Sequence, residues 1–263
     1  MEDLNTAIDI AVEAGGVVLS YFGTDRVDAR AKGDRDVVTA ADTASETLIL
    51  TRLREAFPGD GVVAEEGGKE AARGRRRWYV DPLDGTLNYS RGLPVWCVSL
   101  ALFDGDQPVL GVVHDPIRGE TFSAEAGSGA RLNGDPITTS GTTRLEDAFV
   151  HLTIDFHEAS LAAGLEDMEQ LAPRVLRTRN IGSAALALAY VAAGRLDGMV
   201  HRFANAWDYG AGVLLVREAG GAITEVAGGP YTVNSLAVLA AATEQLHGGL
   251  AGLLPASRSG RVE

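Results

Sequence analysis

The stretch from Trp78 to Tyr89, with the sequence WYVDPLDGTLNY, constrains this chain more than any other part of it. Three bulky residues lead into it as a buried strand would, and two carboxylates, Asp81 and Asp84, follow on either side of a proline. Proline fixes φ and lacks an N–H group, so the spacing of the carboxylates is held stiffly. Carboxylates that converge at a strand end repel each other unless a cation lies between them, and a hard divalent cation prefers oxygen ligands. The alternative is an Asp-Pro turn followed by an Asp-Gly turn, without a ligand.

The charge and length of the chain narrow its class. It has 263 residues and a formal net charge of -13, with 46% hydrophobic and 22% charged residues, which is ordinary for a globular enzyme. The acidic balance argues against nucleic acid or an anionic membrane surface as the main partner. It would also repel a phosphorylated substrate unless bound cations neutralise the site.

The cysteine content and the start of the chain suggest where the protein works. The single cysteine, Cys97, excludes an internal disulfide and fits a reducing compartment. It lies in an apolar run, which predicts a buried structural thiol rather than a nucleophile. The acidic start Met1–Leu4 lacks the basic segment of a signal peptide, and no apolar run approaches the roughly 20 residues needed to span a membrane. We therefore expect a cytoplasmic protein without membrane attachment.

The pattern of residues 1–143 predicts an α+β half. Apolar residues at helical spacing predict helices at 3–21 and from about 42 to 57, where Thr39 and Asp42 both suit the helix start. Turn signals separate short apolar runs that predict strands at 62–64, 95–103, 109–114 and 121–124, with a short strand or loop at 27–32, a solvated loop at 68–77 and a tight turn at 133–134. This order favours an antiparallel meander over βαβ repeats.

Residues 144–263 follow a polar stretch at about 140–146, which we take as the boundary between two halves. Their pattern predicts strands at 148–152, 175–180, 197–200, 222–225 and 236–241, and helices at 157–171, 183–193, 207–219 and 244–254. Strands that alternate with helices predict an α/β layer. Residues 256–263 are polar, and we expect them to be frayed.

Acidic residues stand at the ends of several predicted elements. They are Asp42, Glu65 in the pair Glu65-Glu66, Asp81 with Asp84, and Asp208 after Trp207. Each has a plain structural alternative, because Asp caps helices and paired Glu residues are usually on the surface. Taken together and in this order, they are more informative than any one of them.

This constellation resembles the inositol monophosphatase family, which is part of a magnesium-dependent, lithium-sensitive phosphatase superfamily. The matching blocks are Asp36–Asp42, Glu65-Glu66, Trp78–Tyr89, Gly182–Leu186, Trp207-Asp208 with Ala211-Gly212, and Glu218–Gly221. They span most of the chain. The resemblance implies an α+β or α/β fold, namely the layered α-β-α-β-α sandwich of the sugar phosphatases.

The resemblance also implies roles for individual residues. The residues implied to hold two or three Mg²⁺ ions are Glu65, Asp81, Leu83 through its carbonyl, Asp84 and Asp208. Those implied in catalysis are Asp42, Thr86 and Glu65, with Asp42 and Thr86 paired near the attacking water. Those implied in substrate binding are Gly85, Thr86, Ser183, Ala184, His201 and Asp208. Carboxylate and carbonyl ligands without Cys or His favour magnesium over zinc, which agrees with this set.

Three positions depart from the family pattern. His201 replaces a glutamate that usually accepts hydrogen bonds from substrate hydroxyls, Ala187 replaces a frequent Asp or Asn, and Ala64 replaces a glycine before the glutamate pair. The first two weaken the expectation of inositol as the alcohol. His201 has the alternative of a partly exposed strand-end residue with no role. The metal ligands are complete, so we expect an active enzyme.

The substrate and partners stay open at this level. We expect a small phosphorylated polyol or sugar, with histidinol phosphate, fructose 1,6-bisphosphate or adenosine 3′,5′-bisphosphate as alternatives. Candidate contacts for a distal anion are Arg91, Arg179 and Arg202. A regulatory interaction protein is the alternative of another class, and a homodimer is expected from the resemblance.

Overall fold

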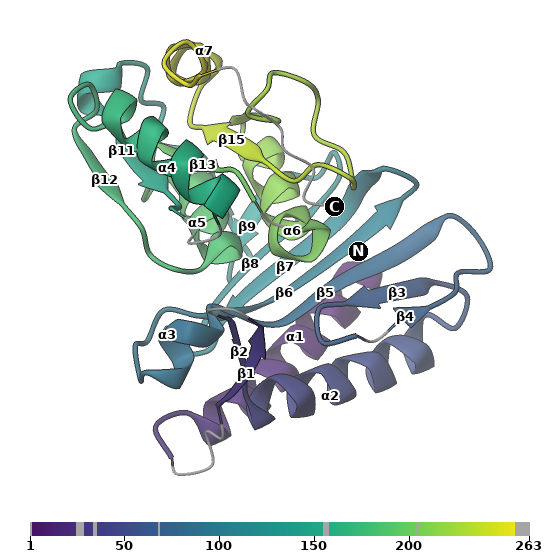
Figure 1. The fold of residues 1–263 in the computed structure, drawn as a ribbon. Helices are drawn as coiled ribbons and strands as arrows, with labels where there is room; N and C mark the ends of the chain where they lie inside the picture. The colour runs from purple at the N-terminus through teal and green to yellow at the C-terminus, as the bar shows by residue number, and fades with distance from the viewer. Residues whose placement is uncertain are drawn as a thin grey trace.

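The protein, described here from a computed structural model, is built of five layers (Figure 1). The structure describes residues 2–24, 29–33, 36–67, 69–154, 158–203 and 205–255. Helices and sheets alternate in the order α-β-α-β-α, which confirms the predicted sandwich. Within these residues, no helix combines the length and apolar character needed to cross a bilayer.

The first sheet has eight strands in the order β10-β9-β8-β7-β6-β5-β3-β4. Their bounds are β3 Gly61–Ala64, β4 Lys69–Glu70, β5 Arg76–Asp84, β6 Cys97–Asp104, β7 Gln107–Asp115, β8 Glu120–Glu125, β9 Ala130–Leu132 and β10 Asp135–Ile137. All neighbours are antiparallel except β3 and β5, which run parallel. The expected meander is therefore present, and the exception brings the carboxyl ends of β3 and β5 to the same edge.

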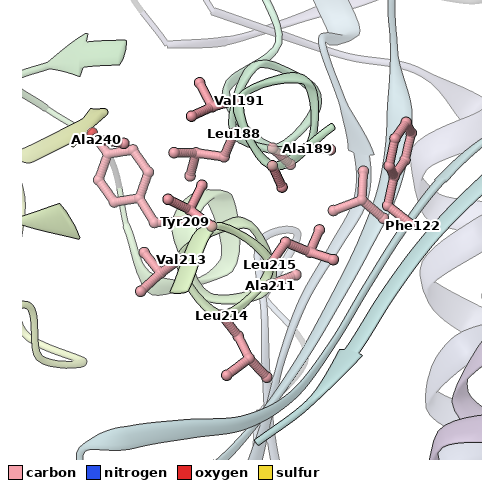
Figure 2. Packing of buried hydrophobic residues seen from close by; sticks show 14 of the residues in the cluster. Phe122, Leu188, Ala189, Val191, Tyr209, Ala211, Val213, Leu214, Leu215 and Ala240 are labelled. Carbon is pink, nitrogen blue, oxygen red and sulfur yellow. The ribbon is translucent and has the colours of Figure 1, made fainter. Parts of the chain in front are cut away.

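Helices α1 (Glu2–Tyr21) and α2 (Ala40–Ala56) cover one face of this sheet, and a small hairpin of β1 (Arg30–Gly33) and β2 (Asp36–Val38) lies between them in the chain. The other face is covered by α5 (Ala184–Ala192) and α6 (Ala206–Glu218). These two helices come from the second half of the sequence. Figure 2 shows them side by side, between Phe122 of the eight-stranded sheet and Ala240 of the second sheet.

The second sheet has five strands in the order β12-β11-β13-β15-β14. Their bounds are β11 Phe149–Leu152, β12 Arg177–Arg179, β13 Gly198–His201, β14 Ala222–Thr224 and β15 Val238–Ala241. Helices α4 (Glu158–Leu171) and α7 (Glu244–Ala251) form the outermost layer, where Leu171, Leu246 and Leu250 share one buried cluster with this sheet. The short helices α3 (Thr86–Ser90) and η1 (Leu145–Asp147) complete the fold.

Strand β6 shows why the first sheet needs helices on both faces. Side chains alternate along a strand, and here Val98, Leu100 and Leu102 pack toward α1 and α2. Cys97, Ala101 and Phe103 pack toward α5 and α6. A strand that is apolar on both faces can be buried only between two covering layers.

A bulge in β5 turns both of its carboxylates toward the same layer. Asp81 pairs with Ser99 and Asp84 pairs with Cys97, so three steps along β5 match two along β6. Without the extra residue, side chains three positions apart would point to opposite faces. Because of the bulge, Asp81 and Asp84 both face the layer of α5 and α6.

Helix α6 approaches the first sheet closely because glycines line the contact. A Cβ atom on Gly111 of β7 would lie 2.8 Å from the Ala211 carbonyl oxygen, and one on Gly210 would lie 2.7 Å from the Phe103 ring. Against α5, a Cβ atom on Gly212 would lie 2.4 Å from Leu188 Cβ. These contacts set the depth at which α6 brings Asp208 to the sheet.

Several predicted elements differ in extent from the observed ones. Strand β5 continues through Asp84, where the alternative interpretation placed turns, and the expected loop at 68–77 contains the two-residue strand β4. Helix α7 ends at Ala251, three residues before the predicted end. The predicted frayed tail at 256–263 and residues 27, 28 and 157 of predicted elements lie outside the described residues. The division into halves at residue 143 stays a prediction, and α5 and α6 show that the two parts share a core.

We expect Gly111→Ala to lower the free energy of unfolding by about 1–3 kcal/mol, because the backbone of Ala211 has no room to yield to a methyl group. Urea denaturation measures the change. The control is Gly16→Ala in α1, where nothing lies within 4 Å of the added Cβ and a gain of about 0.5–1 kcal/mol is expected. Equal effects of the two substitutions would contradict the close-packing argument.

Candidate metal centre and active site

Three carboxylates, two of them buried and that of Asp208 half-buried, meet where the first sheet faces α6. Oxygen atoms of Asp81, Asp84 and Asp208 all lie within 4.8 Å of one another. Asp81 and Asp84 come from the bulged end of β5, and Asp208 comes from the first turn of α6. Asp81 and Asp208 are more than 120 positions apart in the sequence, and the packing of α6 on the sheet brings them together.

Asp84 is held by donors from the second half of the chain. Its Oδ2 atom accepts hydrogen bonds from Ser183 Oγ at 2.5 Å and from Ala185 N at 2.9 Å, and it lies 3.6 Å from Cys97 Sγ. Its Oδ1 atom accepts one longer bond, of 3.2 Å, from Ala184 N. Oδ2 is therefore engaged by several donors, whereas Oδ1 retains capacity to bind a cation.

Asp208 and Asp42 occupy equivalent positions in two helices. Each is the third residue of its helix, and each accepts a hydrogen bond from the N-cap backbone: Thr39 N to Asp42 Oδ2 at 2.8 Å, and Asn205 N to Asp208 Oδ2 at 2.5 Å. One carboxylate oxygen thus caps the helix and the other is directed elsewhere. The capping alternative and the functional role are compatible at both positions.

Asp42 and Thr86 are in contact, as the resemblance implied. Thr86 Oγ1 lies 3.1 Å from Asp42 Oδ1 and 2.9 Å from the carbonyl oxygen of Leu83. A hydroxyl has one proton, so it donates to one of these acceptors at a time and keeps lone pairs for another donor. The pair lies beside the bulge, because Thr86 is the first residue of α3 after Gly85.

Glu65 directly follows the carboxyl end of β3. It lies near Asp81, Asp84 and Asp208 but is not among the residues whose oxygen atoms all lie within 4.8 Å of one another. Its backbone N–H donates to the Val80 carbonyl at 3.1 Å, so it is placed beside Asp81 by the parallel pairing of β3 and β5. Its charge is close enough to raise the pKa of Asp81 and that of Asp208.

Burial and mutual repulsion strain this site electrostatically. Burial raises the pKa of Asp81 well above its usual range, and the charges of Glu65, Asp84 and Asp208 raise it further. Burial also raises the pKa of Asp208 well above its usual range, although the hydrogen bond from Asn205 lowers it. The pKa of Asp84 is raised by burial and lowered by its hydrogen bonds from Ser183, Ala184 and Ala185. A bound cation would relieve this repulsion, so the donor set fits a hard divalent metal.

The sequence of the whole chain matches a known family. Residues 1–259 match the pattern of the inositol monophosphatase family. An inositol-1-monophosphatase of Mesorhizobium japonicum is 37% identical over 90% of this chain and 90% of its own length.

The chain belongs to the inositol monophosphatase family.

Other relatives and structures carry different names on the same fold. A fructose-1,6-bisphosphatase/inositol-1-monophosphatase of Thermotoga maritima is 37% identical over 87% of this chain and 86% of its own length. The Nus factor SuhB of Escherichia coli (strain K12) is 38% identical over 86% of each chain. The crystal structure of extragenic suppressor protein suhB from Bartonella henselae superposes with a TM-score of 0.92 at 35% identity, over 97% of this chain and 99% of that one. Membership makes this protein a phosphomonoesterase with a divalent metal cofactor.

The residues expected to contact substrate lie at the start of α3, at the start of α5 and at the end of β13. Gly85 has φ of 93° and is the N-cap of α3 beside Thr86. Ser183 and Ala184 lie at the start of α5, and their polar groups are directed to Asp84. His201 ends β13 and is buried, with its ring against that of Tyr209 at 5.5 Å between centroids. Their contacts with substrate stay predictions.

Of the three arginines considered as contacts for a distal anion, one is already engaged in a buried ion pair. Arg202 forms a buried bidentate ion pair with Asp167, at 2.5 and 2.6 Å, which contradicts a role in binding a distal anion. Arg179 stacks over the Phe149 ring at 5.1 Å on the edge strand β12. Arg91 is exposed at the end of α3.

Sequence reasoning assigned no role to two small polar residues that support the site. Ser99 lies opposite Asp81 in β6, and its hydroxyl donates to the Trp207 carbonyl at 3.2 Å, next to Asp208. Ser45 of α2 donates to the Pro82 carbonyl at 3.0 Å. A serine inside an otherwise apolar strand was the available signal for Ser99, since it falls on the α6-facing side of β6.

We expect Asp81→Asn to stabilise the metal-free protein at pH 8 and to lose this advantage near pH 4. In the folded protein the pKa of Asp81 is raised above its usual value of about 3.9, which is the value in the unfolded state. At pH values between these two pKa values, the native state therefore binds more protons than the unfolded state. The contribution of Asp81 to the free energy of unfolding therefore falls as pH rises through that range. Asp81→Asn removes this pH-dependent loss of stability. Thermal unfolding in EDTA from pH 4 to 8 measures this. Identical pH profiles for both proteins would contradict it.

Proposed function

We propose that this protein is an Mg²⁺-dependent phosphomonoesterase that hydrolyses a small phosphorylated polyol or sugar. The observation that carries the proposal is the cluster of three carboxylates, Asp81, Asp84 and Asp208, with the pair of Asp42 and Thr86 beside it, in a chain of this family. A phosphate ester needs its negative charge neutralised and a water oriented for attack, and the site provides groups for both tasks.

The ligand chemistry supports magnesium. The residues proposed to hold two or three ions are Asp81, Asp84, Asp208, Glu65 and Leu83 through its carbonyl. All offer oxygen atoms, which hard cations prefer, and none offers sulfur or imidazole nitrogen. When bound, Mg²⁺ neutralises phosphate charge and acts as a Lewis acid.

Asp42 and Thr86 are proposed to orient the attacking water. Asp42 Oδ1 accepts a hydrogen bond from the Thr86 hydroxyl, which leaves an oxygen lone pair of Thr86 to accept a hydrogen bond from water. Burial raises the pKa of Asp42, although its bonds from Thr39 lower it, and a raised pKa makes the carboxylate a better proton acceptor. The turn at Gly85 and Thr86 is proposed to present backbone N–H groups to the phosphate oxygens.

The substrate is proposed from the relatives and from one departure. Relatives bear the names of an inositol-1-monophosphatase and of a fructose-1,6-bisphosphatase/inositol-1-monophosphatase, which supports polyol or sugar phosphates as the class. His201, in place of the usual glutamate, offers an imidazole rather than a carboxylate to the substrate. Histidinol phosphate and adenosine 3′,5′-bisphosphate stay alternatives.

A second candidate function is a regulatory interaction. Its support is the 38% identity to the Nus factor SuhB. A homodimer and a cytoplasmic location also stay predictions, and sedimentation at micromolar protein tests the first of them. Purified protein that hydrolyses no phosphomonoester in the presence of Mg²⁺ would favour the regulatory candidate.

We expect Asp84→Asn to abolish most Mg²⁺-dependent phosphate release from inositol 1-phosphate and fructose 1,6-bisphosphate. The amide carries no charge for the cation and places N–H groups against the donors of Ser183 and Ala185. Phosphate release is followed against Mg²⁺ concentration, with circular dichroism to verify folding. Undiminished release by the folded variant would sink the metal assignment.

Thr86→Ala should lower kcat by about 10²–10⁴-fold, the range for loss of a group that orients or transfers a proton. Thr86→Ser retains the hydroxyl and should restore most of the activity. Thr47→Ala in the exposed part of α2 is the control, since its hydroxyl bonds only within its own helix, to the Thr43 carbonyl. Equal kcat for Thr86→Ala and the control would exclude the proposed role.

His201→Glu should shift preference toward inositol 1-phosphate, because a carboxylate accepts hydrogen bonds from vicinal hydroxyls more strongly than imidazole does. The ratio of kcat/KM for inositol 1-phosphate to that for fructose 1,6-bisphosphate measures the shift. An unchanged ratio would remove His201 from the substrate pocket.

A further inference from the structure

The loop at 180–183, which leads into α5, joins the two parts of the molecule at the metal site. Its end supplies the Ser183 hydroxyl and the Ala184 and Ala185 N–H groups that bind Asp84. Ser183 is the N-cap of α5 but makes no capping bond of its own. A carboxylate from β5 therefore caps this helix, and the position of the loop decides how Asp84 is oriented.

Asn88 holds this loop from the other part of the chain. Its Nδ2 group lies 2.8 Å from the Ile181 carbonyl oxygen, 2.9 Å from that of Val95 and 3.3 Å from that of Gly182. An amide NH₂ has two protons, so it is saturated by these three acceptors. Asn88 thus ties the loop to the segment just before β6.

The backbones at this junction leave no space for adjustment. A Cβ atom on Gly85 would lie 2.9 Å from the Val95 carbonyl oxygen and 3.2 Å from that of Gly182. A Cβ atom on Gly182, at φ of 73°, would lie 2.9 Å from Asn88 Nδ2. On the far side, the Ile181 N–H donates to His151 Nδ1 at 3.4 Å. The loop is therefore fixed from both sides.

We propose that Asn88 is a positioning residue for the metal centre, acting through the loop at 180–183. By fixing the loop, Asn88 keeps the donors of Ser183 and Ala185 on Asp84 Oδ2, so that the carboxylate holds the orientation in which one of its oxygens lies within 4.8 Å of those of Asp81 and Asp208. The inference rests on the proposed function, because it takes Asp84 as a metal ligand. Outer-shell groups that orient ligands change metal affinity by about 10–100-fold, and Asn88 acts one step further out.

The test is the Mg²⁺ dissociation constant, measured by calorimetry without substrate. Asn88→Ala is expected to weaken Mg²⁺ binding by about tenfold. Asn88→Asp, of the same shape, should weaken it further, because it turns a carboxylate toward three carbonyl oxygens. Ser90→Ala on the same helix is the control, since its hydroxyl bonds to Leu87 within α3. A role in stability alone would lower the melting temperature of Asn88→Ala and leave its Mg²⁺ affinity unchanged, and that result would overturn the proposal.

The unaltered protein provides a second measurement that does not depend on whether a variant folds. Coupling between two sites is reciprocal, so Mg²⁺ should slow hydrogen exchange at the amides of Ala184 and Ala185. Unchanged exchange in a protein that binds Mg²⁺ would overturn the role of the loop. Absence of Mg²⁺ binding by the unaltered protein would instead overturn the proposed function, so the two failures are distinguishable.

Discussion

Repulsion among three closely spaced carboxylates is the constraint on which this structure depends. Oxygen atoms of Asp81, Asp84 and Asp208 lie within 4.8 Å of one another, in a site where burial raises the pKa of all three and neighbouring carboxylates raise those of Asp81 and Asp208 further. Such an arrangement costs stability in the absence of a cation, since each carboxylate opposes the ionisation of the others. It persists because the surrounding fold fixes the backbone at these carboxylates, through the β5 bulge and the first turn of α6.

Carboxylates in and beside this cluster also stabilise the first turns of three helices. Asp84 caps α5, Asp208 accepts the N-cap N–H of α6, and Asp42 does so for α2. At Asp42 and Asp208 one oxygen accepts the N-cap N–H, whereas at Asp84 both oxygens accept N–H groups of α5, Oδ1 through the longer bond. Function and fold are therefore linked at these positions, and a substitution there is expected to change stability as well as activity. This is why a measurement of metal affinity separates the two effects better than activity does.

The shared core determines where the second half presents its groups. Helix α6 packs so closely on the first sheet and on α5 that an added Cβ atom would clash at three glycines, namely Gly111, Gly210 and Gly212. Ser99 then fixes the start of α6 through the Trp207 carbonyl. A shift of α6 would separate Asp208 from the other two carboxylates. The closeness of this packing, more than any single contact, assembles the site.

The amino-acid sequence alone was enough to predict the phosphatase family and the fold class. The family was predicted from the stretch from Asp81 to Thr86 together with Asp42, Glu65 and Asp208. The meander and the α/β layer were predicted from the periodicity of apolar residues, because local patterns reflect burial on one or two faces. How these residues contact one another became visible in the three-dimensional structure. The β5 bulge turns two carboxylates to one face, and an amide at Asn88 orders a loop 93 positions away. Arg202, which the sequence left as a candidate for binding an anion, is paired with Asp167 instead. These relations depend on register and on contacts between distant segments, which no local pattern encodes.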